Sequence, residues 1–389
     1  MPRATVAKSA ERVPCSRIRE LAEIAMKMDG VLKLYFGESN LPTPAYIKDA
    51  AAEAMAGGHT FYTANAGYLS LRRAIAAKYR ELHGVDLDGD SEIVVTASGV
   101  QALNLAIRCV LDPGDEAIVL TPAWPNASSN VAMSSATARE IPLCLRGDRY
   151  RMDLGAVEAA ITPRTRLLVY TSPSNPLGWV AAEAEQRALL EICRRRGLWL
   201  MADEVYERLY YQGPVAPSIL RLCARDDAVL VPQSFSKSYC MTGWRLGWLV
   251  APRDLARKAT ELNEFIVSHA PAMAQKAGEV ALRDGEPGIA EMVARLRANR
   301  DYALAALEGL PRVTTPRPDG AFYLFPRIDG LRDSFEFCRR LLTEKRVGLA
   351  PGVAFGAGGE GSIRICYAAD RTVLEPAMER LREFLLESA

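Results

Sequence analysis

The sequence predicts an α/β fold in which helices sandwich a mostly parallel sheet, with a smaller α+β domain after it. Two observations support this. Short apolar runs that read as strands alternate with helical patterns over the first two thirds of the chain, which is typical of a parallel sheet. From about residue 271 the pattern changes to long helices (273–283, 289–310) and short strands (322–326, 362–367). The predicted sheet strands are residues 93–96, 116–120, 138–143, 166–170, 198–202 and 228–231.

The composition is that of a soluble globular protein with room for about two domains, since 49% of the 389 residues are apolar and 24% are charged. The 48 basic residues nearly cancel the 47 acidic ones, so bulk charge gives no reason to expect nucleic acid or an anionic membrane as a partner. No apolar run approaches the roughly 18 residues of a membrane helix. Eight scattered cysteines and three dispersed histidines indicate reduced thiols and no metal site. We therefore expect a cytoplasmic protein.

The domain organisation that follows has three parts. Residues 1–30 form an N-terminal arm that joins the small domain, residues 31–280 form the large domain, and residues 281–389 form the small C-terminal domain. The arm has one apolar face, which packs either on its own domain or on a second subunit: Ile18, Leu21, Ile24, Ala25 and Met28.

The elements before the first sheet strand are a strand at 31–36, a loop at 37–44 and a helix at 46–56. Gly37 ends the strand, and it is either a plain turn former or a point of close approach. Tyr62 follows in a polar loop, where an aromatic side chain more often packs on its own chain.

A turn of small residues comes directly after strand 93–96 and opens a helix. Backbone N–H groups and the helix dipole bind phosphate in such an arrangement. The amides of Ser98, Gly99 and Val100 would supply the donors.

Further candidate side chains follow the carboxyl ends of the next strands. Trp124 comes after strand 116–120, where its indole could stack on a flat ring or fill a domain interface. Asn175, Asp203 and Lys237 follow three later strands, and ligands of an open parallel sheet lie beyond these ends. We therefore expect these side chains to converge, although Asp203 could instead be a helix N-cap.

The segment 234–247 contains one lysine just after an apolar strand. Desolvation disfavours the ammonium, so Lys237 is suited to be a partly neutral nucleophile for Schiff-base chemistry. Ser234, Ser236 and Arg245 offer hydroxyls and a guanidinium of the kind that holds a phosphate dianion. The combination suggests pyridoxal 5'-phosphate, while a solvated surface loop is the alternative.

This segment resembles the lysine segment of the class I and II aminotransferases, which are pyridoxal phosphate enzymes of fold type I. The similarity extends motif by motif from about Leu32 to the C-terminus. It implies that Lys237 carries the cofactor as an aldimine and that Arg245 grips its phosphate. It also implies a homodimer in which Tyr62 reaches the phosphate of the neighbouring subunit. Val100 departs from the family, where a hydroxyl residue is common.

The resemblance assigns the other site residues as well. Asp203 pairs with the ring nitrogen, which keeps the ring an electron sink. Asn175 and Tyr206 hydrogen-bond the phenolic oxygen, and Trp124 stacks on the ring. Arg364, on the predicted strand 362–367, binds the substrate α-carboxylate beside Gly37, although an arginine on a strand can also be an ordinary exposed residue.

The predicted function is a pyridoxal phosphate aminotransferase that moves an amino group from an L-amino acid to a 2-oxo acid in two ping-pong half-reactions. Lys237, Asp203 and Tyr206 are the predicted catalytic residues. A β- or γ-eliminating enzyme such as a C–S lyase remains an alternative, because it shares this fold and site. Nothing in the sequence marks the substrate side chain.

Two other classes are disfavoured. A transcriptional regulator of this fold carries a helix-turn-helix domain ahead of it, and about thirty residues before Leu32 leave no room for one. Residues 356–361 match GxGxxG, but an apolar β-branched run follows instead of the helix that a dinucleotide site requires. We predict a hairpin-like loop there.

Overall fold

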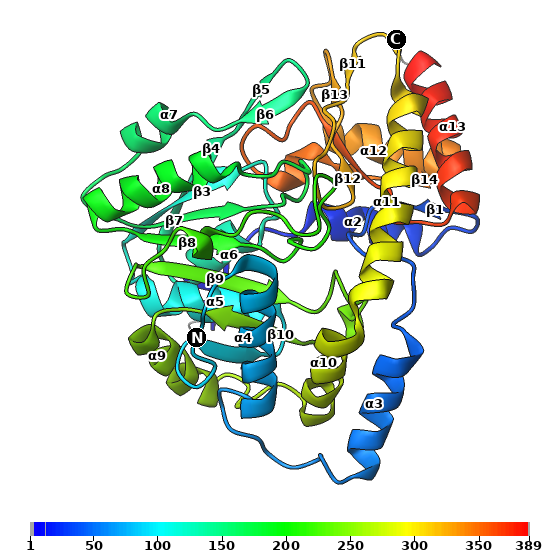
Figure 1. Ribbon diagram of the computed structural model, residues 1–389. Helices are drawn as coiled ribbons and strands as arrows, with labels where there is room; N and C mark the ends of the chain where they lie inside the picture. Colours follow the sequence, from blue (N-terminus) through cyan, green and yellow to red (C-terminus); the bar gives the residue numbers. More distant parts are fainter. Residues whose placement is uncertain (1–3, 12, 388–389) are drawn as a thin grey trace.

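The computed structural model describes residues 4–11 and 13–387, which form a large α/β part and a smaller part beside it (Figure 1). The large part is built on a seven-stranded sheet of order β2-β10-β9-β8-β7-β3-β4, in which β10 alone is antiparallel to its neighbours. Its strands are β2 (Ile93–Thr96), β3 (Glu116–Thr121), β4 (Thr137–Pro142), β7 (Thr165–Thr171), β8 (Trp199–Asp203), β9 (Val229–Ser234) and β10 (Gly247–Val250).

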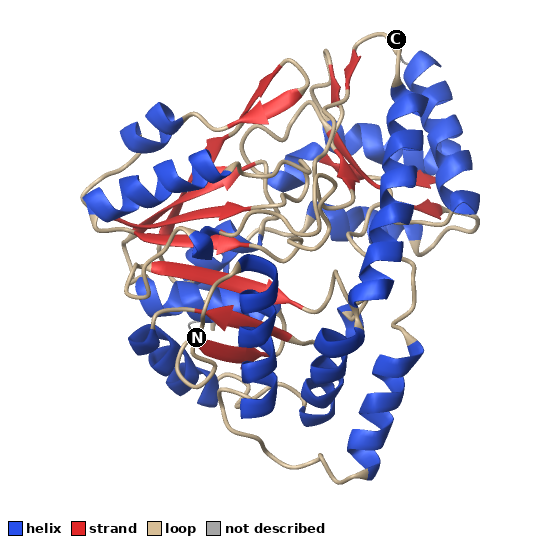
Figure 2. Ribbon diagram, viewed as in Figure 1, coloured by secondary structure: helices blue, strands red, loops and turns tan. Residues whose placement is uncertain are grey.

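Two layers of helices cover the sheet because successive strand residues point to opposite faces (Figure 2). One face packs α5 (Gly99–Val110), α6 (Asn126–Met133) and α9 (Arg253–Glu264) against strand residues such as Val94 and Leu230. The other face buries residues such as Val95 and Val231 beneath α4 (Leu69–His83), α8 (Glu183–Arg196) and α10 (Ala272–Asp284). The predicted α/β sandwich is confirmed.

The smaller part contains a three-stranded antiparallel sheet of order β12-β16-β15. Its strands are β12 (Tyr323–Leu324), β15 (Ala350–Pro351) and β16 (Ile363–Cys366), and its helices are α11 (Glu286–Leu307), α12 (Ser334–Lys345) and α13 (Arg371–Glu387). Figure 1 shows α11 as one long helix that rises from the end of α10 to lie beside α13. The segment 356–361 connects the antiparallel pair β15 and β16, so the predicted hairpin-like loop is confirmed.

The N-terminal segment packs on this smaller part. Helix α2 (Arg17–Ala25) begins at Ser16, whose side chain accepts a hydrogen bond from the Arg19 amide at 3.2 Å. Its buried face of Ile18, Leu21, Ala22 and Ala25 contacts α12 and β15. The apolar face of the arm therefore packs on its own chain.

Two contacts bear on the domain limits. Strand β1 (Leu32–Lys33) pairs in parallel with β14 (Val347–Gly348), so the chain stays with the smaller part until about residue 34. Helix α10 packs on α3 (Ala45–Ala56) and α4, so the larger part extends to its end at Asp284. We propose limits near Gly37 and Gly285.

The remaining elements are short. They are α1 (Lys8–Glu11), β5 (Cys144–Arg146), β6 (Arg149–Arg151), α7 (Leu154–Ala159), β11 (Val313–Thr314), β13 (Arg327–Ile328) and three single-turn 3₁₀ helices at Ile219–Arg221, Thr242–Trp244 and Gly352–Phe355. Among residues 4–11 and 13–387, no helix combines the length and apolar character needed to span a bilayer.

Candidate active site

The carboxyl ends of the parallel strands and the start of β10 meet at one edge of the sheet. Ser98 follows β2, Trp124 follows β3, Asn175 follows β7, Asp203 ends β8 and Lys237 follows β9. This edge faces the smaller part, which contributes Arg364 from β16. Residues far apart in the sequence therefore converge on one place, as expected for an open α/β sheet.

Lys237 is partly buried at this edge. Its Nζ donates a hydrogen bond to the carbonyl oxygen of Gly37 at 2.6 Å and lies 5.7 Å from the centre of the Tyr206 ring. Burial, which disfavours the ammonium form, lowers the pKa of Lys237 to about 8. An appreciable fraction of this amine is therefore neutral close to physiological pH.

Asp203 is the last residue of β8 and lies near Lys237. Burial raises the pKa of its carboxyl to about 6, against the opposing effects of the Val205 N–H and the Lys237 charge. The Val205 amide donates to Oδ1 at 3.3 Å, and within the described residues Oδ2 has no partner. No helix begins after Asp203, so the N-cap alternative is wrong. One oxygen of a carboxylate is thus available to a ligand.

Arg364 is fully buried, which excludes the alternative of an ordinary exposed arginine. Its Nη1 donates to Asn175 Oδ1 at 3.0 Å, and its Nη2 donates to the carbonyl oxygen of Tyr35. Its guanidinium carbon lies 4.6 Å from the centre of the Tyr323 ring. The buried Nε has no hydrogen-bond partner within the described residues. A buried cation without a paired carboxylate and with one free donor is suited to an anionic ligand.

Tyr323 is a contributor that the sequence did not reveal. Its hydroxyl lies 2.7 Å from the hydroxyl of Tyr206, and its ring packs on Arg364. A Cβ at Gly37 would lie 2.3 Å from the Tyr323 hydroxyl oxygen, so close approach requires glycine there. Burial raises the pKa of Tyr206, which keeps its hydroxyl protonated and able to donate.

The turn before α5 provides backbone donors. Ser98 caps α5, because its Oγ accepts from the Gln101 amide at 3.2 Å, and its φ of 122° is a strained value for a residue with a Cβ. Gly99 packs against β9, since a Cβ there would lie 3.0 Å from the Ser234 Cβ. The first amides of α5 are therefore held next to the serine hydroxyls of the lysine segment.

Ser234 and Ser236 complete this corner of the site, and Arg245 lies exposed at the end of the same segment. The Oγ of Ser234 donates to the Oγ of Ser236 at 2.9 Å. Arg245 has a left-handed backbone (φ 54°), and its Nη1 donates to the carbonyl oxygen of Thr242 at 2.7 Å. Val100 is 45% exposed, so it offers its amide but no side-chain donor. Helix N-terminal amides and neighbouring hydroxyls form a donor set suited to a phosphate.

Trp124 lies at the site within this chain, whereas Tyr62 is exposed away from it. The Trp124 ring centre lies 5.7 Å from the guanidinium carbon of Arg364 and 6.4 Å from the Phe355 ring, so it forms part of the wall of the site. Tyr62 is 90% exposed, and its ring meets the edge of the His269 ring at 5.6 Å. Among residues 4–11 and 13–387, no hydrogen bond or ring contact joins Tyr62 to the other candidate residues.

Comparisons with known proteins agree with this arrangement. A family model described as aminotransferase class I and II matches residues 30–381. The aspartate aminotransferase of Pyrococcus horikoshii is 33% identical over 373 residues, which make up 95% of this chain and 94% of that protein. Aromatic-amino-acid aminotransferase 2 of Thermococcus litoralis is 33% identical over 382 residues, or 97% of each chain.

A solved structure has the same fold. A single mutant of the Thermus thermophilus aspartate aminotransferase superposes with a TM-score of 0.91 at 31% identity, covering 98% of this chain and 100% of that chain. The match to the family model and to these relatives spans nearly the whole chain, including every residue of the site. This chain therefore belongs to the class I and II aminotransferases of fold type I, and it is an enzyme that transfers amino groups.

Proposed function

We propose that this aminotransferase uses pyridoxal 5'-phosphate, bound covalently at Lys237, to transfer an amino group from an L-amino acid to a 2-oxo acid. The observation that supports this most directly is the Lys237 amine, whose pKa is lowered to about 8, beside the incompletely partnered carboxylate of Asp203. A nucleophilic amine is the group that bonds to an aldehyde, and a carboxylate is the group that pairs with a protonated pyridine nitrogen.

The other residues of the site fit the same cofactor. The amides of Ser98, Gly99 and Val100, the hydroxyls of Ser234 and Ser236, and the Arg245 guanidinium would hold its phosphate. The absence of a Cβ at Gly99 and Gly247 keeps this corner compact, because a Cβ at Gly247 would lie 2.5 Å from the Gly99 amide nitrogen. Asn175 and Tyr206 would face the phenolic oxygen, and Trp124 would cover the ring.

When bound, pyridoxal phosphate supplies an aldehyde that combines with amines and a ring that accepts electrons. Arg364 binds the substrate α-carboxylate with its guanidinium, which Asn175 and the Tyr35 carbonyl orient. The Lys237 amine would act as the base that takes the proton from the substrate α-carbon and, once protonated, as the acid that gives it back. Asp203 would pair with the ring nitrogen in its protonated form, and the Tyr206 hydroxyl would donate a hydrogen bond to the phenolic oxygen.

We further propose a homodimer in which Tyr62 reaches the neighbouring site. Two nearby loops support this, because their aromatic and aliphatic side chains are exposed when the chain is considered by itself: Phe61, Tyr62, Phe265, Ile266 and Val267. His269 packs against Tyr62 and joins the two loops. Exposed apolar patches of this kind mark protein interfaces. A cytoplasmic location is part of the same proposal, and the eight cysteines, all unpaired, agree with it.

A half-reaction screen tests the proposed reaction. The purified enzyme is mixed with single amino acids, including aspartate and aromatic amino acids, which the names of the relatives suggest. Conversion of the aldehyde absorbance to that of the amine form, without release of ammonia or pyruvate, is the expected result. Release of ammonia together with a 2-oxo acid from one amino acid alone would instead support the eliminating lyase.

A further inference from the structure

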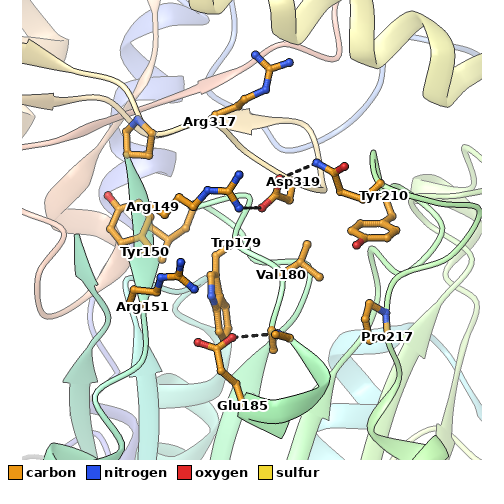
Figure 3. A pocket seen from close by; sticks show the side chains of 15 residues that line it. Arg149, Tyr150, Arg151, Trp179, Val180, Glu185, Tyr210, Pro217, Arg317 and Asp319 are labelled. Atoms are coloured by element: carbon orange, nitrogen blue, oxygen red, sulfur yellow. Dashed lines mark hydrogen bonds and ion pairs between the residues drawn. The ribbon is translucent and has the colours of Figure 1, made fainter. Parts of the chain in front are cut away.

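A second cavity, with a volume of about 350 Å³, lies outside the site described above (Figure 3). Four segments form most of it: strand β6, the loop 177–182, residues 210–212 and residues 316–319. Glu185 of α8 and Pro217 complete the lining. Its volume is at the lower end of the range for small-molecule sites. None of its lining residues is among the five exposed side chains of the proposed dimer surface.

The inner wall of the cavity is aromatic. Tyr150 and Trp179 line it and are only 9% and 8% exposed. Within the described residues, neither the Tyr150 hydroxyl nor the Trp179 Nε1 makes a hydrogen bond. Figure 3 shows the Trp179 side chain between those of Arg151 and Val180. The wall therefore offers flat apolar surface together with two free polar groups, a combination suited to an aromatic ligand with an acceptor.

The acidic groups of the cavity are already engaged. Asp319 accepts a hydrogen bond from Gln212 Nε2 at 3.1 Å and lies 3.6 Å from the Arg149 guanidinium. Glu185 accepts from the Ala182 amide at 2.9 Å. These interactions, drawn as dashed lines in Figure 3, give Asp319 a charged and a polar partner, and give one oxygen of Glu185 a backbone amide.

The cations of the cavity exceed these carboxylates by one. Arg149 is opposite Asp319, and Arg317 pairs with Asp301 at 2.9 Å. Arg151 projects from β6 beside Trp179, and within the described residues it makes no ion pair or hydrogen bond. Among the three arginines of the cavity, Arg151 is thus the one without a carboxylate partner, and Glu185 is the carboxylate without an ion pair in the described residues.

We propose that this cavity binds a small organic carboxylate. Its flat apolar body lies on Trp179 and Tyr150, and its carboxylate pairs with Arg151, whose planar fork matches the two carboxylate oxygens. The Tyr150 hydroxyl provides one further donor. This cavity is separate from the proposed catalytic site, in which Arg364 is the partner of the substrate carboxylate.

The two sites are nevertheless close along the chain. The Ser174 amide donates to the carbonyl oxygen of Trp179 at 2.8 Å, and this turn contains Asn175, which binds Arg364. A carboxylate probe could therefore bind in either place, and the test must distinguish them.

Phenylacetate serves as the probe, and its uncharged isostere phenylacetamide as the control ligand, in calorimetric titrations of the cofactor-loaded enzyme. We expect saturable binding of phenylacetate that persists in Arg364→Ala, because that variant removes only the carboxylate partner of the catalytic site. Arg151→Gln should weaken this binding about tenfold, as expected for the loss of a charge-assisted hydrogen bond. Phenylacetamide should bind the unmodified enzyme about as weakly as phenylacetate binds Arg151→Gln.

Arg146→Gln is the matched control. Arg146 is an exposed arginine on β5, the partner strand of β6, and it does not line the cavity. This variant should bind phenylacetate as the unmodified enzyme does. The proposal is overturned if the unmodified enzyme does not bind phenylacetate, if Arg151→Gln binds it equally well, or if Arg364→Ala abolishes all binding.

Discussion

Lys237 and Asp203 lie near each other at the ends of neighbouring strands, and burial shifts their pKa values toward each other, to about 8 and about 6. The same desolvation acts in opposite directions because it disfavours whichever form is charged. The ordinary pKa values of these groups are 10.5 and 3.8, so burial brings the titration of both close to neutral pH.

The lowered pKa of Lys237 predicts how the apoenzyme takes up its cofactor. Only the neutral amine attacks an aldehyde, so the attachment rate should rise about tenfold per pH unit below pH 8 and level off above it. Asp203, whose pKa is about 6, is mostly ionised above pH 7, so the rise between pH 7 and pH 8 reports the Lys237 amine. Stopped-flow absorbance of the apoenzyme mixed with pyridoxal phosphate measures the rate. A rate that keeps rising to pH 10 would mean that the amine is not perturbed.

Replacing Arg364 with lysine tests whether positive charge alone is enough to hold the substrate carboxylate or whether the planar guanidinium is needed. Lysine keeps the charge but loses the planar fork, and it leaves Asn175 Oδ1 without its present donor. We expect Arg364→Lys to lower kcat/KM for amino acids about a hundredfold, which corresponds to roughly 3 kcal/mol. Steady-state kinetics measures this, and the absorbance of the bound cofactor should stay unchanged as a control. Unaltered kcat/KM would remove the role proposed for Arg364.

The sequence predicts correctly the location of those site residues that directly follow or end a strand. Asp203, Asn175 and Lys237 are of this kind, because parallel strands bring their carboxyl ends together whatever the remaining fold. Tyr323 is different, since its contact with Gly37 depends on how the smaller part packs against the larger one. Nothing local in the apolar run around Tyr323 indicates that contact.

At the level of elements, the site depends on how closely β10, β9 and the start of α5 approach one another. A Cβ at Gly247 would lie 2.5 Å from the Gly99 amide nitrogen and 2.6 Å from the Gln233 carbonyl oxygen. Both are backbone atoms, one at the start of α5 next to Ser98 and one in β9, so neither can move aside at low cost.

Gly247→Ala should therefore separate α5 from β9. We expect a loss of about 1–3 kcal/mol in the free energy of unfolding, which is typical of overpacking, and weaker retention of the cofactor phosphate. Thermal unfolding and cofactor content after gel filtration measure the two effects. Gly243→Ala is the matched control, because a Cβ there has no atom within 4 Å. Equal behaviour of the two variants would contradict the packing argument.

The sequence predicts the parallel strands well and β10 not at all. Apolar runs locate each parallel strand within a few residues, since all of these strands except the edge strand β4 are mostly buried on both faces. The end of β9 extends from residue 231 to Ser234 because the strand continues to pair with β10 after Pro232. An antiparallel strand of four residues that follows the catalytic loop has no periodicity of its own to reveal it.

At the level of the whole molecule, two parts of the chain build one site, and a second copy is proposed to complete it. Arg364 and Tyr323 belong to the smaller part, while Lys237 and Asp203 belong to the larger one. The partner's position is not encoded in any local pattern, so the sequence suggests the dimer only through resemblance. The same holds for the substrate side chain, which no motif marks.

Phe265, which is 88% exposed, provides a test of the proposed dimer. Phe265→Asp adds a charge to the exposed apolar surface, so we expect monomers and a loss of activity because Tyr62 no longer reaches a neighbouring site. Leu386→Asp is the control, since Leu386 is 50% exposed on α13, far from that surface in sequence and on the smaller part. Analytical ultracentrifugation and activity measure the outcome. A fully active dimer of Phe265→Asp would exclude this surface as the interface.

The central claim is that Lys237 forms the covalent bond to pyridoxal phosphate. Borohydride reduction of the holoenzyme, proteolysis and mass spectrometry locate that bond. We expect the phosphopyridoxyl group on Lys237 alone, in the peptide that also contains Ser236 and Ser238. Labelling of another lysine, or of none, would contradict the account.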